Sequence, residues 1–397
     1  MFSFEVVAKD GEARTGRLVT PHGVIKTPSY VAVGTLGSVR ALSAQDLMEI
    51  GTQVMISNTY HLHLQPGEDL IERLGGLHRF MGWDRPLMTD SGGFQIFSLG
   101  AAKEHGVGKI APIFPENRAR GGNFGRTGAR PLVSIEEAGA TFTSYLDGSR
   151  RCFTPERIID IQLKLGADII LVLDECTSPL HDFAYTRAAM ERTHRWSDRA
   201  LEVFHENPEN LQALYGIVQG GAYKELREES AAFISDRNFD GYALGGSLGR
   251  SREDMYRVLE WVIPLLREDK PRHLLGIGIV DDIFDLVKQG IDLFDCVAPT
   301  RLARTGTFFK RGKPRFRIHI RNKRYKTDSR PVDEGCDCQT CTHYSRAYLR
   351  YLFLAGEPLG VRLAAIHNLH FLETLMAQIR KAIKDGRIRD MRREWIG

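Results

Sequence analysis

The stretch Leu214-Tyr-Gly-Ile-Val-Gln219 is a short run of apolar, β-favouring residues that ends in a polar side chain. A helical pattern, Tyr223–Arg237, follows it, and a second short run, Tyr242-Ala-Leu-Gly-Gly246, comes next. Both runs are too apolar to alternate with polar residues, as expected of parallel strands that are buried on both faces. The segment therefore predicts a strand–helix unit followed by the strand of the next unit.

The same unit recurs along the chain, and eight β-rich runs can be counted. They are Tyr30–Thr35, Val54–Asn58, Pro86–Asp90, Asp168–Asp174, Leu214–Gln219, Tyr242–Gly246, His273–Gly278 and Leu293–Val297. Eight strand–helix units in about 250–300 residues predict an α/β fold of the (β/α)₈ TIM-barrel type. A doubly wound parallel sheet is the alternative, but no further strand–helix pair follows the eighth unit.

Two segments interrupt the repeat. Residues 100–130 are rich in glycine, proline and arginine and lead into the strand-like run Thr141–Leu146, so they predict an insertion with a hairpin. Residues 302–343 carry a basic block and three clustered cysteines, and two helical stretches follow them. We therefore expect a barrel core over residues 1–301, with a basic, glycine-rich insertion near 100–130, and a basic zinc-binding subdomain with C-terminal helices over residues 302–397.

The composition excludes several classes of protein. With 397 residues, of which 42% are hydrophobic and 26% charged, the chain can bury a large core and is neither fibrous nor disordered. Its start lacks a basic region before an apolar segment, and no run of about 18 apolar residues occurs, so we expect a soluble, cytoplasmic protein without a membrane partner. Six cysteines are few for a disulfide scaffold of this size.

Positive charge is concentrated in one region. The net charge is only +4, but residues 301–330 hold twelve Lys and Arg residues against a single acid, Asp328. The aromatic residues that interleave with these cations are Phe308, Phe309, Phe316 and Tyr325. A solvated loop is the common interpretation of a charged run, but cations mixed with aromatic rings suit a surface that follows an RNA backbone and stacks on its bases. We therefore favour RNA as a partner.

Polar residues end most of the predicted strands, where a barrel carries its reactive groups. They are Asn58, Asp90, Asp174, Gln219, Gly245-Gly246 and Asp295. Three carboxylates among them suit acid/base and nucleophilic chemistry at a sugar carbon. Asp90 and Asp174 each have a simpler interpretation as helix caps. Asp295 is harder to explain in that way, because it lies inside an apolar run and a buried carboxylate needs a partner or a function.

A second group of residues has metal-ligand spacing. The pattern is Cys336-x-Cys338-x₂-Cys341, followed by His367 on a predicted helix. A Cys₃His set leaves no open coordination position, so we expect one structural zinc ion per subunit. The rival histidines are His343, which is too close in sequence to Cys341 to close a loop comfortably, and His370, one turn beyond His367. His367 can also be an ordinary packing histidine.

Several motifs, taken together, resemble one family. They are Asp90-Ser-Gly-Gly-Phe-Gln95, Phe294-Asp-Cys-Val-Ala-Pro-Thr-Arg301, the Cys₃His set, Ser57-Asn-Thr-Tyr-His-Leu62, Leu173-Asp-Glu-Cys176, Gly216-Ile-Val-Gln-Gly220 and Leu275-Gly-Ile-Gly278. In this order, over nearly the whole chain, they are similar to the queuine tRNA-ribosyltransferase family, also called tRNA-guanine transglycosylase. The resemblance implies a (β/α)₈ barrel with an inserted zinc-binding subdomain.

The resemblance also implies a reaction and the residues that perform it. Guanine at wobble position 34 of tRNAs with GUN anticodons, the Asp, Asn, His and Tyr isoacceptors, is exchanged for a 7-deazaguanine base. Asp295 would be the nucleophile that forms a covalent bond to ribose C1′, and Asp90 the general acid and base. Asn58 and Gln95 would orient Asp90.

Further roles follow from the same resemblance. Residues that match the base-recognition positions are Asp174, Gln219 and Gly246, with Phe94 and Leu275 on the two faces of the base. Arg301 and Arg304 match positions that read anticodon uridines, and Cys336, Cys338, Cys341 and His367 match zinc ligands. Bacterial members are homodimers that pair through the zinc region, and the reaction needs no organic cofactor.

The chain departs from the family pattern in two places that matter for substrate choice. Residues 100–130 are longer and more basic than the usual link, and the motif around Gly246 differs. The sequence Gly245-Gly-Ser-Leu-Gly-Arg250 carries an arginine where many bacterial members have a glutamate. A cation there disfavours the aminomethyl group of preQ1, so preQ1, the neutral cyano base preQ0 and queuine all remain open.

Two other functions compete with this interpretation. One is a non-catalytic tRNA-binding accessory subunit, against which the presence of both Asp90 and Asp295 argues. The other is an unrelated barrel hydrolase or aldolase, which would leave the basic block and the cysteine cluster unexplained.

Overall fold

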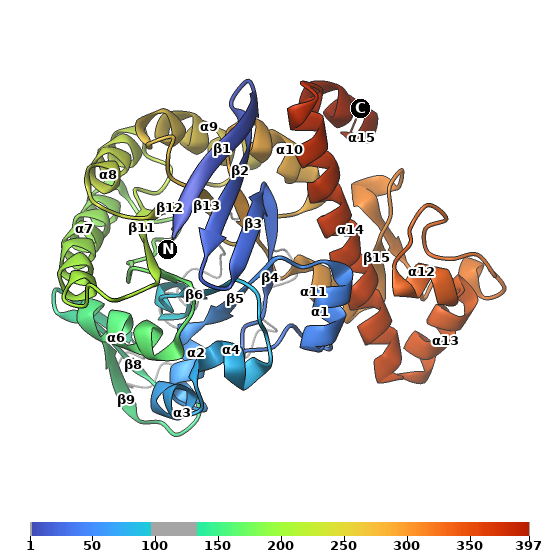
Figure 1. Ribbon diagram of the computed structural model, residues 1–397, viewed down its shortest axis with the longest axis horizontal. Coiled ribbons are helices and arrows are strands. Elements are labelled where there is room, and N and C mark those ends of the chain that lie inside the picture. The colour runs from blue at the N-terminus through green and yellow to red at the C-terminus, as the bar shows by residue number, and fades with distance from the viewer. Residues whose placement is uncertain (1, 97–132, 397) are drawn as a thin grey trace. The chain divides into compact units, whose positions relative to one another are not determined.

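Eight strands form a closed parallel barrel in the computed structural model, which describes residues 2–96 and 133–396 (Figure 1). In chain order they are β4 (Ser29–Val33), β5 (Val54–Asn58), β6 (Leu87–Asp90), β10 (Ile169–Leu171), β11 (Ala213–Val218), β12 (Gly241–Leu244), β13 (Arg272–Leu274) and β14 (Leu293–Asp295). Each strand overlaps one of the eight predicted runs. The prediction of a (β/α)₈ barrel is confirmed, and the doubly wound sheet is excluded because the first and last strands, β4 and β14, pair with each other.

The described chain divides into two compact units. The first unit consists mainly of residues 58–80 and 88–273, and the second of residues 3–57, 81–87 and 274–397. This division runs through the barrel, because the paired strands β4 and β14 belong to the second unit whereas β10, β11 and β12 belong to the first. The second unit also contains the C-terminal helices. The expected boundary between a barrel core and a zinc-binding subdomain near residue 301 is not the boundary between these two units, and it stays a prediction.

The first unit combines barrel strands, their helices and a small antiparallel sheet. Its helices are α2 (Thr59–Leu64), α3 (Glu68–Arg73), α4 (Gly76–Met81), α6 (Pro155–Leu165), α7 (Phe183–His205), α8 (Lys224–Asp236), α9 (Arg252–Val262) and the 3₁₀ helix η2 (Ile263–Leu265). The sheet contains β7 (Val133–Glu136), β8 (Gly139–Thr143) and β9 (Arg150–Phe153). The expected hairpin corresponds to two strands, β8 and β9, of this three-stranded sheet, in which β8 pairs with both neighbours. The basic insertion near 100–130 lies outside the described residues.

The second unit begins with an antiparallel sheet that the sequence analysis did not predict. Its strands are β1 (Ser3–Asp10), β2 (Ala13–Thr20) and β3 (Gly23–Thr27). Arg14 of β2 forms an ion pair with Asp292, which directly precedes β14, with 2.5 Å between the charged atoms and both side chains buried. This pair ties the sheet to the barrel strand, and because both charges are desolvated, removal of one partner would strand the other.

The remaining elements of the second unit surround one long helix. They are α1 (Ala44–Ile50), α10 (Val280–Lys288), α11 (Ala298–Ala303), β15 (Thr307–Phe309), η3 (Pro314–Phe316), β16 (Arg317–His319), η4 (Lys323–Tyr325), α12 (Gln339–His343), α13 (Arg346–Ala355), α14 (Pro358–Lys384) and α15 (Ile388–Ile396). The long helix α14, red in Figure 1, contacts α1, α11, α12 and α13. It starts at the predicted Pro358, whose fixed φ and missing N–H suit a first helical turn.

Local sequence signals account for several helix ends. Ser43 and Asp46 form a capping box at the start of α1, and Gly51 ends the helix in the left-handed region at φ 88°. The Thr154 side chain caps α6 by accepting from the N–H of Arg157, and Gly166 ends the helix at φ 73°. Within the described residues, no helix is long and apolar enough to cross a membrane.

Candidate functional site

Asp90 is the last residue of β6, and hydrogen bonds from its surroundings fix its carboxylate. Asn58 Nδ2 donates to Oδ2 at 2.7 Å, while the backbone N–H groups of Thr59 and Gly92 donate to Oδ1 at 3.2 and 3.1 Å. Asn58 is itself held, because its Oδ1 accepts from the N–H of His61 at 3.0 Å. The structure thus brings Asn58 and Asp90 together at the ends of neighbouring strands, and Asp90 does more than cap its own loop.

A second carboxylate, Asp174, forms a buried group with Gln219. Gln219 Nε2 donates to Asp174 Oδ2 at 2.6 Å, and the hydroxyl of Ser91 donates to Oδ1 at 3.4 Å. Asp174 and Gln219 are only 8% and 1% exposed. Gln219 Oε1 is buried and has no hydrogen-bond partner among the described residues. A buried acceptor without a partner costs about 1–3 kcal/mol, so this atom suits a donor from a bound molecule.

Glycines make room for this pair of side chains. A Cβ on Gly93 would lie 2.5 Å from Asp174 Oδ1. Gly246 adopts φ +69° and its Cβ would meet the Gln219 side-chain amide. Neither position accepts a larger residue without displacing the polar groups. The predicted base-recognition residues Asp174, Gln219 and Gly246 are therefore neighbours in the first unit.

The residue that holds these loops in place, Arg227, is not predicted by any sequence motif. Arg227 of α8 is fully buried and donates to four backbone carbonyls: those of Gly221 (2.6 Å), Val218 (2.8 Å), Gly245 (3.0 Å) and Ser247 (2.7 Å). Burial lowers the pKa of the guanidinium to about 9. The sequence does contain a signal for this role. Arg227 is a cation at helical spacing from Ser230, Ala231 and Ile234, which form the buried face of α8.

Phe94 and Gln95 lie in a helical turn after Gly93. The Phe94 side chain is 38% exposed, so its ring is open to a ligand. Gln95 Oε1 is buried and lacks a hydrogen-bond partner within the part of the chain that the structure describes. The roles expected for these two residues stay predictions.

In the second unit, Asp295 is the last residue of β14. Its Oδ1 accepts from the N–H of Gly276 at 2.8 Å, in the loop that also carries Leu275. The following residue, Cys296, is buried, and burial raises the pKa of its thiol to about 11, so the thiol stays protonated at neutral pH. Asp295 is half-buried at a strand end and fixed by a backbone donor, which suits a nucleophilic carboxylate better than a packing residue.

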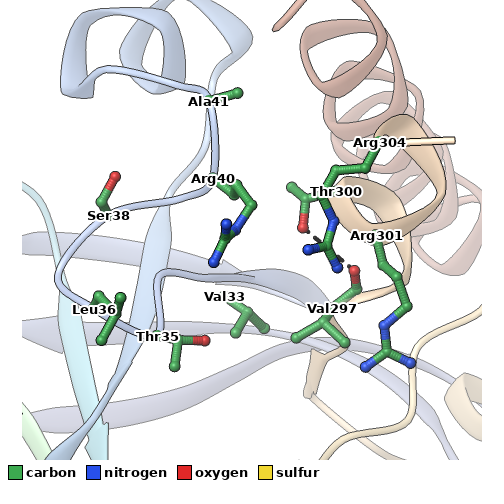
Figure 2. Close-up of a pocket in the computed structure, with 10 residues that line it drawn as sticks. All are labelled: Val33, Thr35, Leu36, Ser38, Arg40, Ala41, Val297, Thr300, Arg301 and Arg304. Atoms are coloured by element: carbon green, nitrogen blue, oxygen red, sulfur yellow. Dashed lines mark hydrogen bonds between the residues drawn. The ribbon is translucent and has the colours of Figure 1, made fainter. Parts of the chain in front are cut away.

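Arg301 and Arg304 line one cavity, together with an arginine that was not predicted. The cavity has a volume of about 370 Å³, and Arg40 lies on its other side, as Figure 2 shows. The pKa of Arg304 is lowered by burial first and then by the charges of Arg40 and Arg301. Three cations therefore converge on this cavity.

Four residues of the second unit form a cluster that can bind a metal ion. The Nδ1 atom of His367 lies 3.7 Å from Cys336 Sγ, 3.5 Å from Cys338 Sγ and 3.3 Å from Cys341 Sγ. Zn–S bonds of about 2.3 Å and Zn–N bonds of about 2.0–2.1 Å would place tetrahedral ligands about 3.5–3.8 Å apart, so the spacing fits. His367 Nε2 donates to the Phe309 carbonyl at 2.8 Å, which turns Nδ1 toward the cysteines.

Neither rival histidine matches this arrangement. His370 Nδ1 lies 3.7 Å from Cys336 Sγ, and His370 Nε2 lies 3.2 Å from a carboxylate oxygen of the exposed Asp337. His343 is exposed and contacts Thr342 and the carbonyl of Gln339. The phase of α14 therefore selects His367.

Arg250, where the chain departs from the family pattern, lies two residues before the start of α9. Its N–H donates to Asp254 at 2.8 Å, and its Nε donates to the carbonyl of Pro179 at 3.4 Å. Pro179 belongs to the loop after β10 that also carries Asp174. The Arg250 cation is thus exposed and joins the β12 loop to the Asp174 loop.

The fold and these groups define a (β/α)₈-barrel protein with carboxylates at strand ends and a separate Cys₃His cluster. A family model described as queuine tRNA-ribosyltransferase matches residues 9–113 and 122–397. The chain therefore belongs to the queuine tRNA-ribosyltransferase family, a family of pentosyltransferases.

Individual relatives agree with this assignment along the whole length of the chain. A protein of Archaeoglobus fulgidus is 49% identical over 395 residues, which cover 97% of this chain and 96% of the relative. Proteins named queuine tRNA-ribosyltransferase from Herpetosiphon aurantiacus and Roseiflexus sp. are 46% and 45% identical. They cover all of this chain, and the matches span 92% and 99% of the relatives.

Proposed function

We propose that this chain exchanges guanine at wobble position 34 of GUN-anticodon tRNAs for a 7-deazaguanine base by two displacements at ribose C1′. The observation that carries the proposal is the pair of strand-end carboxylates, Asp90 and Asp295, each fixed by its own hydrogen-bond donors. Reactive groups of such barrels lie at the carboxyl ends of the strands. Family membership supports the enzyme role.

In the first displacement, an Asp295 carboxylate oxygen bonds to C1′ while the C1′–N9 bond to guanine breaks. Asp90 donates a proton to the departing base, which leaves neutral. In the second displacement, Asp90 takes the proton from N9 of the incoming base, whose nitrogen bonds to C1′ as the ester to Asp295 breaks. The Asn58 amide and the N–H groups of Thr59 and Gly92 orient Asp90 for both proton transfers.

The base is recognised by the group around Asp174. A carboxylate accepts from the N1–H and the exocyclic amine of a guanine-like base, while the second N–H of the Gln219 amide and the backbone N–H at Gly246 donate to the carbonyl oxygen of the base. The shared 2.6 Å hydrogen bond and the absence of room for a Cβ at Gly93 hold these groups in place. Phe94 stacks on one face of the base, and Leu275 lies on the other.

The incoming base is preQ1, preQ0 or queuine, and Arg250 bears on the choice. Arg250 joins the two loops that carry Asp174 and Gly246. A cation at this position disfavours the aminomethyl cation of preQ1 and leaves the neutral cyano base or queuine as better ligands.

The Cys₃His cluster holds a structural zinc ion in this proposal. The donor set, the 3.3–3.7 Å spacing and the hydrogen bond that orients His367 all suit tetrahedral zinc. The ion has no open coordination position, so its role is to hold β15, α12 and α14 together.

The chain pairs with a second copy through the same region. Tyr344, which precedes α13, stacks on Tyr348 with ring centroids 5.6 Å apart, and Tyr348 stacks on Tyr351 of the same helix at 6.4 Å. Tyr348, Tyr351 and Leu354 are 39%, 60% and 56% exposed, and so many large apolar groups on one helix face suit an interface. Sedimentation equilibrium should therefore give twice the 44.8 kDa mass of the chain.

Release of radiolabelled guanine from position 34 tests the proposed exchange. An unmodified tRNA with a GUA anticodon is incubated with the enzyme and preQ1, preQ0 or queuine separately. Release with at least one base supports the exchange, and the order of the three bases gives the specificity. Binding of tRNA without release by any base would refute the exchange and favour an accessory subunit.

A further inference from the structure

Gln219 lies one residue beyond the last paired residue of β11, so its N–H lies outside the strand pairing of the barrel. Val218 pairs with Leu244 of β12, and the pairing ends there. The N–H of Gln219 donates instead to the hydroxyl of Ser230 on α8, at 3.0 Å. Gln219 and Ser230 are 1% and 0% exposed, so water cannot replace this acceptor. A side chain of α8 therefore fixes the backbone from which the Gln219 amide extends.

The hydroxyl of Ser230 is held in turn by a histidine on the neighbouring helix α7 (Figure 1). The Ser230 oxygen lies 3.0 Å from His194 Nε2. The hydroxyl proton is buried and needs an acceptor, and a neutral imidazole that carries its own proton on Nδ1 provides one. The hydrogen bonds therefore run in one direction, from the N–H of Gln219 to Ser230 and from the hydroxyl of Ser230 to His194.

The surroundings of His194 keep its imidazole neutral and in place. Burial lowers its pKa from 6.5 to about 4. A protonated ring would donate from both nitrogens and leave the Ser230 proton without an acceptor. The ring also stacks on Phe233 of α8, with centroids 4.0 Å apart and ring planes within 7° of each other. His194 is therefore a fixed acceptor between α7 and α8.

The preceding residue of α7 has the same role beside the other base-recognition side chain. The N–H of Glu175, which follows Asp174, donates to the hydroxyl of Thr193 at 3.0 Å. That hydroxyl donates to the carbonyl of Ala189 at 2.9 Å. Since Asp174 and Gln219 share a 2.6 Å hydrogen bond, two consecutive residues of α7 anchor the backbone on both sides of this bond.

We propose that His194 and Ser230 are positioning residues for the incoming base, which hold Gln219 through a hydrogen-bond relay and do not contact the base themselves. This inference rests on the proposed function, in which the Gln219 amide binds the base. Ser230→Ala would leave the Gln219 N–H buried without an acceptor, and the end of the strand would have to move to satisfy it. This movement would carry the Gln219 amide away from Asp174 and weaken base binding.

The experiment measures the exchange of guanine 34 in an unmodified GUA-anticodon tRNA for free radiolabelled guanine. The proposed displacements run in both directions, so guanine serves as the incoming base whichever 7-deazaguanine is the natural one. KM and kcat are determined with varied guanine at saturating tRNA. The variants are Ser230→Ala, His194→Leu, His194→Gln and the double variant that combines Ser230→Ala with His194→Leu. Thermal unfolding of each variant checks its fold.

Ser197→Ala is the matched control. Ser197 lies one turn after His194 on α7 and is fully buried, but its hydroxyl has no hydrogen-bond partner among the described residues. The substitution removes a buried hydroxyl from the same helix without breaking the relay. Its KM for guanine should therefore equal that of the wild type.

Ser230→Ala should raise KM for guanine about tenfold, since an unsatisfied buried N–H weakens binding by about this factor. The kcat at saturating guanine and the dissociation constant of tRNA should change little. His194→Leu keeps an apolar group against Phe233 but removes the acceptor, so it should raise KM several-fold. His194→Gln should restore most of the affinity, because its amide oxygen can accept from Ser230. The double variant should match Ser230→Ala, because His194 acts only through Ser230.

Several results would overturn the inference. A wild-type KM in Ser230→Ala would remove the relay from base binding. Additive increases in KM for the two single substitutions would mean that His194 acts through packing alone, and an equal increase in Ser197→Ala would mean the same for Ser230. If Ser230→Ala does not fold, equal KM values in His194→Leu and His194→Gln would overturn the relay. Absence of exchange in the wild type would refute the proposed function itself, which distinguishes the two failures.

Discussion

Arg227 should control affinity for the incoming base without contacting it. The perturbation is Arg227→Lys, which keeps the charge but replaces a planar fork by one ammonium group. Four carbonyls from two loops accept from the guanidinium, and a lysine has only three donors on a single atom, so at least one hydrogen bond is lost. A hydrogen bond from a charged donor contributes about 1.5–3 kcal/mol.

This loss should appear mainly as weaker base binding. The carbonyls of Gly221 and Gly245 have no other hydrogen-bond partner in the described residues, so their loops should loosen around Gln219 and Gly246. Because about 1.4 kcal/mol corresponds to a tenfold change in an equilibrium constant, KM for the incoming base should rise about tenfold or more. The kcat at saturating base and the dissociation constant of tRNA should change little.

The assay is guanine exchange with varied base at saturating tRNA. Arg237→Lys is the matched control, because Arg237 ends the same helix, α8, but pairs with Asp198 at 3.0 Å, away from these loops. A wild-type KM in Arg227→Lys would refute the reasoning. Equal losses in base and tRNA affinity would also refute it, because they would indicate general unfolding and not a positioning role.

Three further results are expected. Gly93→Ala should raise KM for the base by displacing Asp174, since its Cβ would lie 2.5 Å from Oδ1; an unchanged KM would contradict this geometry. Cys338→Ala should lower zinc content and the unfolding temperature together, and full zinc occupancy by elemental analysis would remove Cys338 from the ligands. Burial raises the pKa of Glu373 to about 8 from 4.5, so the folded chain keeps a proton that the unfolded chain loses. The free energy of unfolding should therefore fall as pH rises from about 5 to 8, and Glu373→Gln should abolish this fall in denaturant titrations; an equal pH dependence in both proteins would exclude Glu373 as its source.

The barrel could be predicted from the sequence because its signals are local. Apolar runs bounded by polar or glycine residues mark all eight strands, and glycines such as Gly51 and Gly166 mark helix ends. The N-terminal sheet was not predicted, although β1 alternates exposed and half-buried residues, because the repeat that identified the barrel does not extend to it. Its packing depends on the Arg14–Asp292 pair, which joins residues 278 positions apart.

In the candidate site too, local signals could be predicted from the sequence, whereas contacts between distant residues could not. Clustered cysteines predict a metal site, but only the phase of α14 separates His367 from His370. Strand-end polar residues predict Asp90 and Asp174, whereas the role of Arg227 depends on carbonyls of loops that meet only in the fold. Arg40 joins the predicted Arg301 and Arg304 only because β4 and β14 pair across the closed barrel.

The most direct test of the central claim is capture of the covalent intermediate. Wild-type enzyme is incubated with tRNA, denatured and separated on a denaturing gel, and the same is done with Asp295→Ala and Asp90→Asn. The account predicts an enzyme–tRNA adduct that resists denaturation in the wild type and is absent in Asp295→Ala, while Asp90→Asn binds tRNA but exchanges guanine slowly. An adduct that persists in Asp295→Ala would contradict the assignment of Asp295 as the nucleophile.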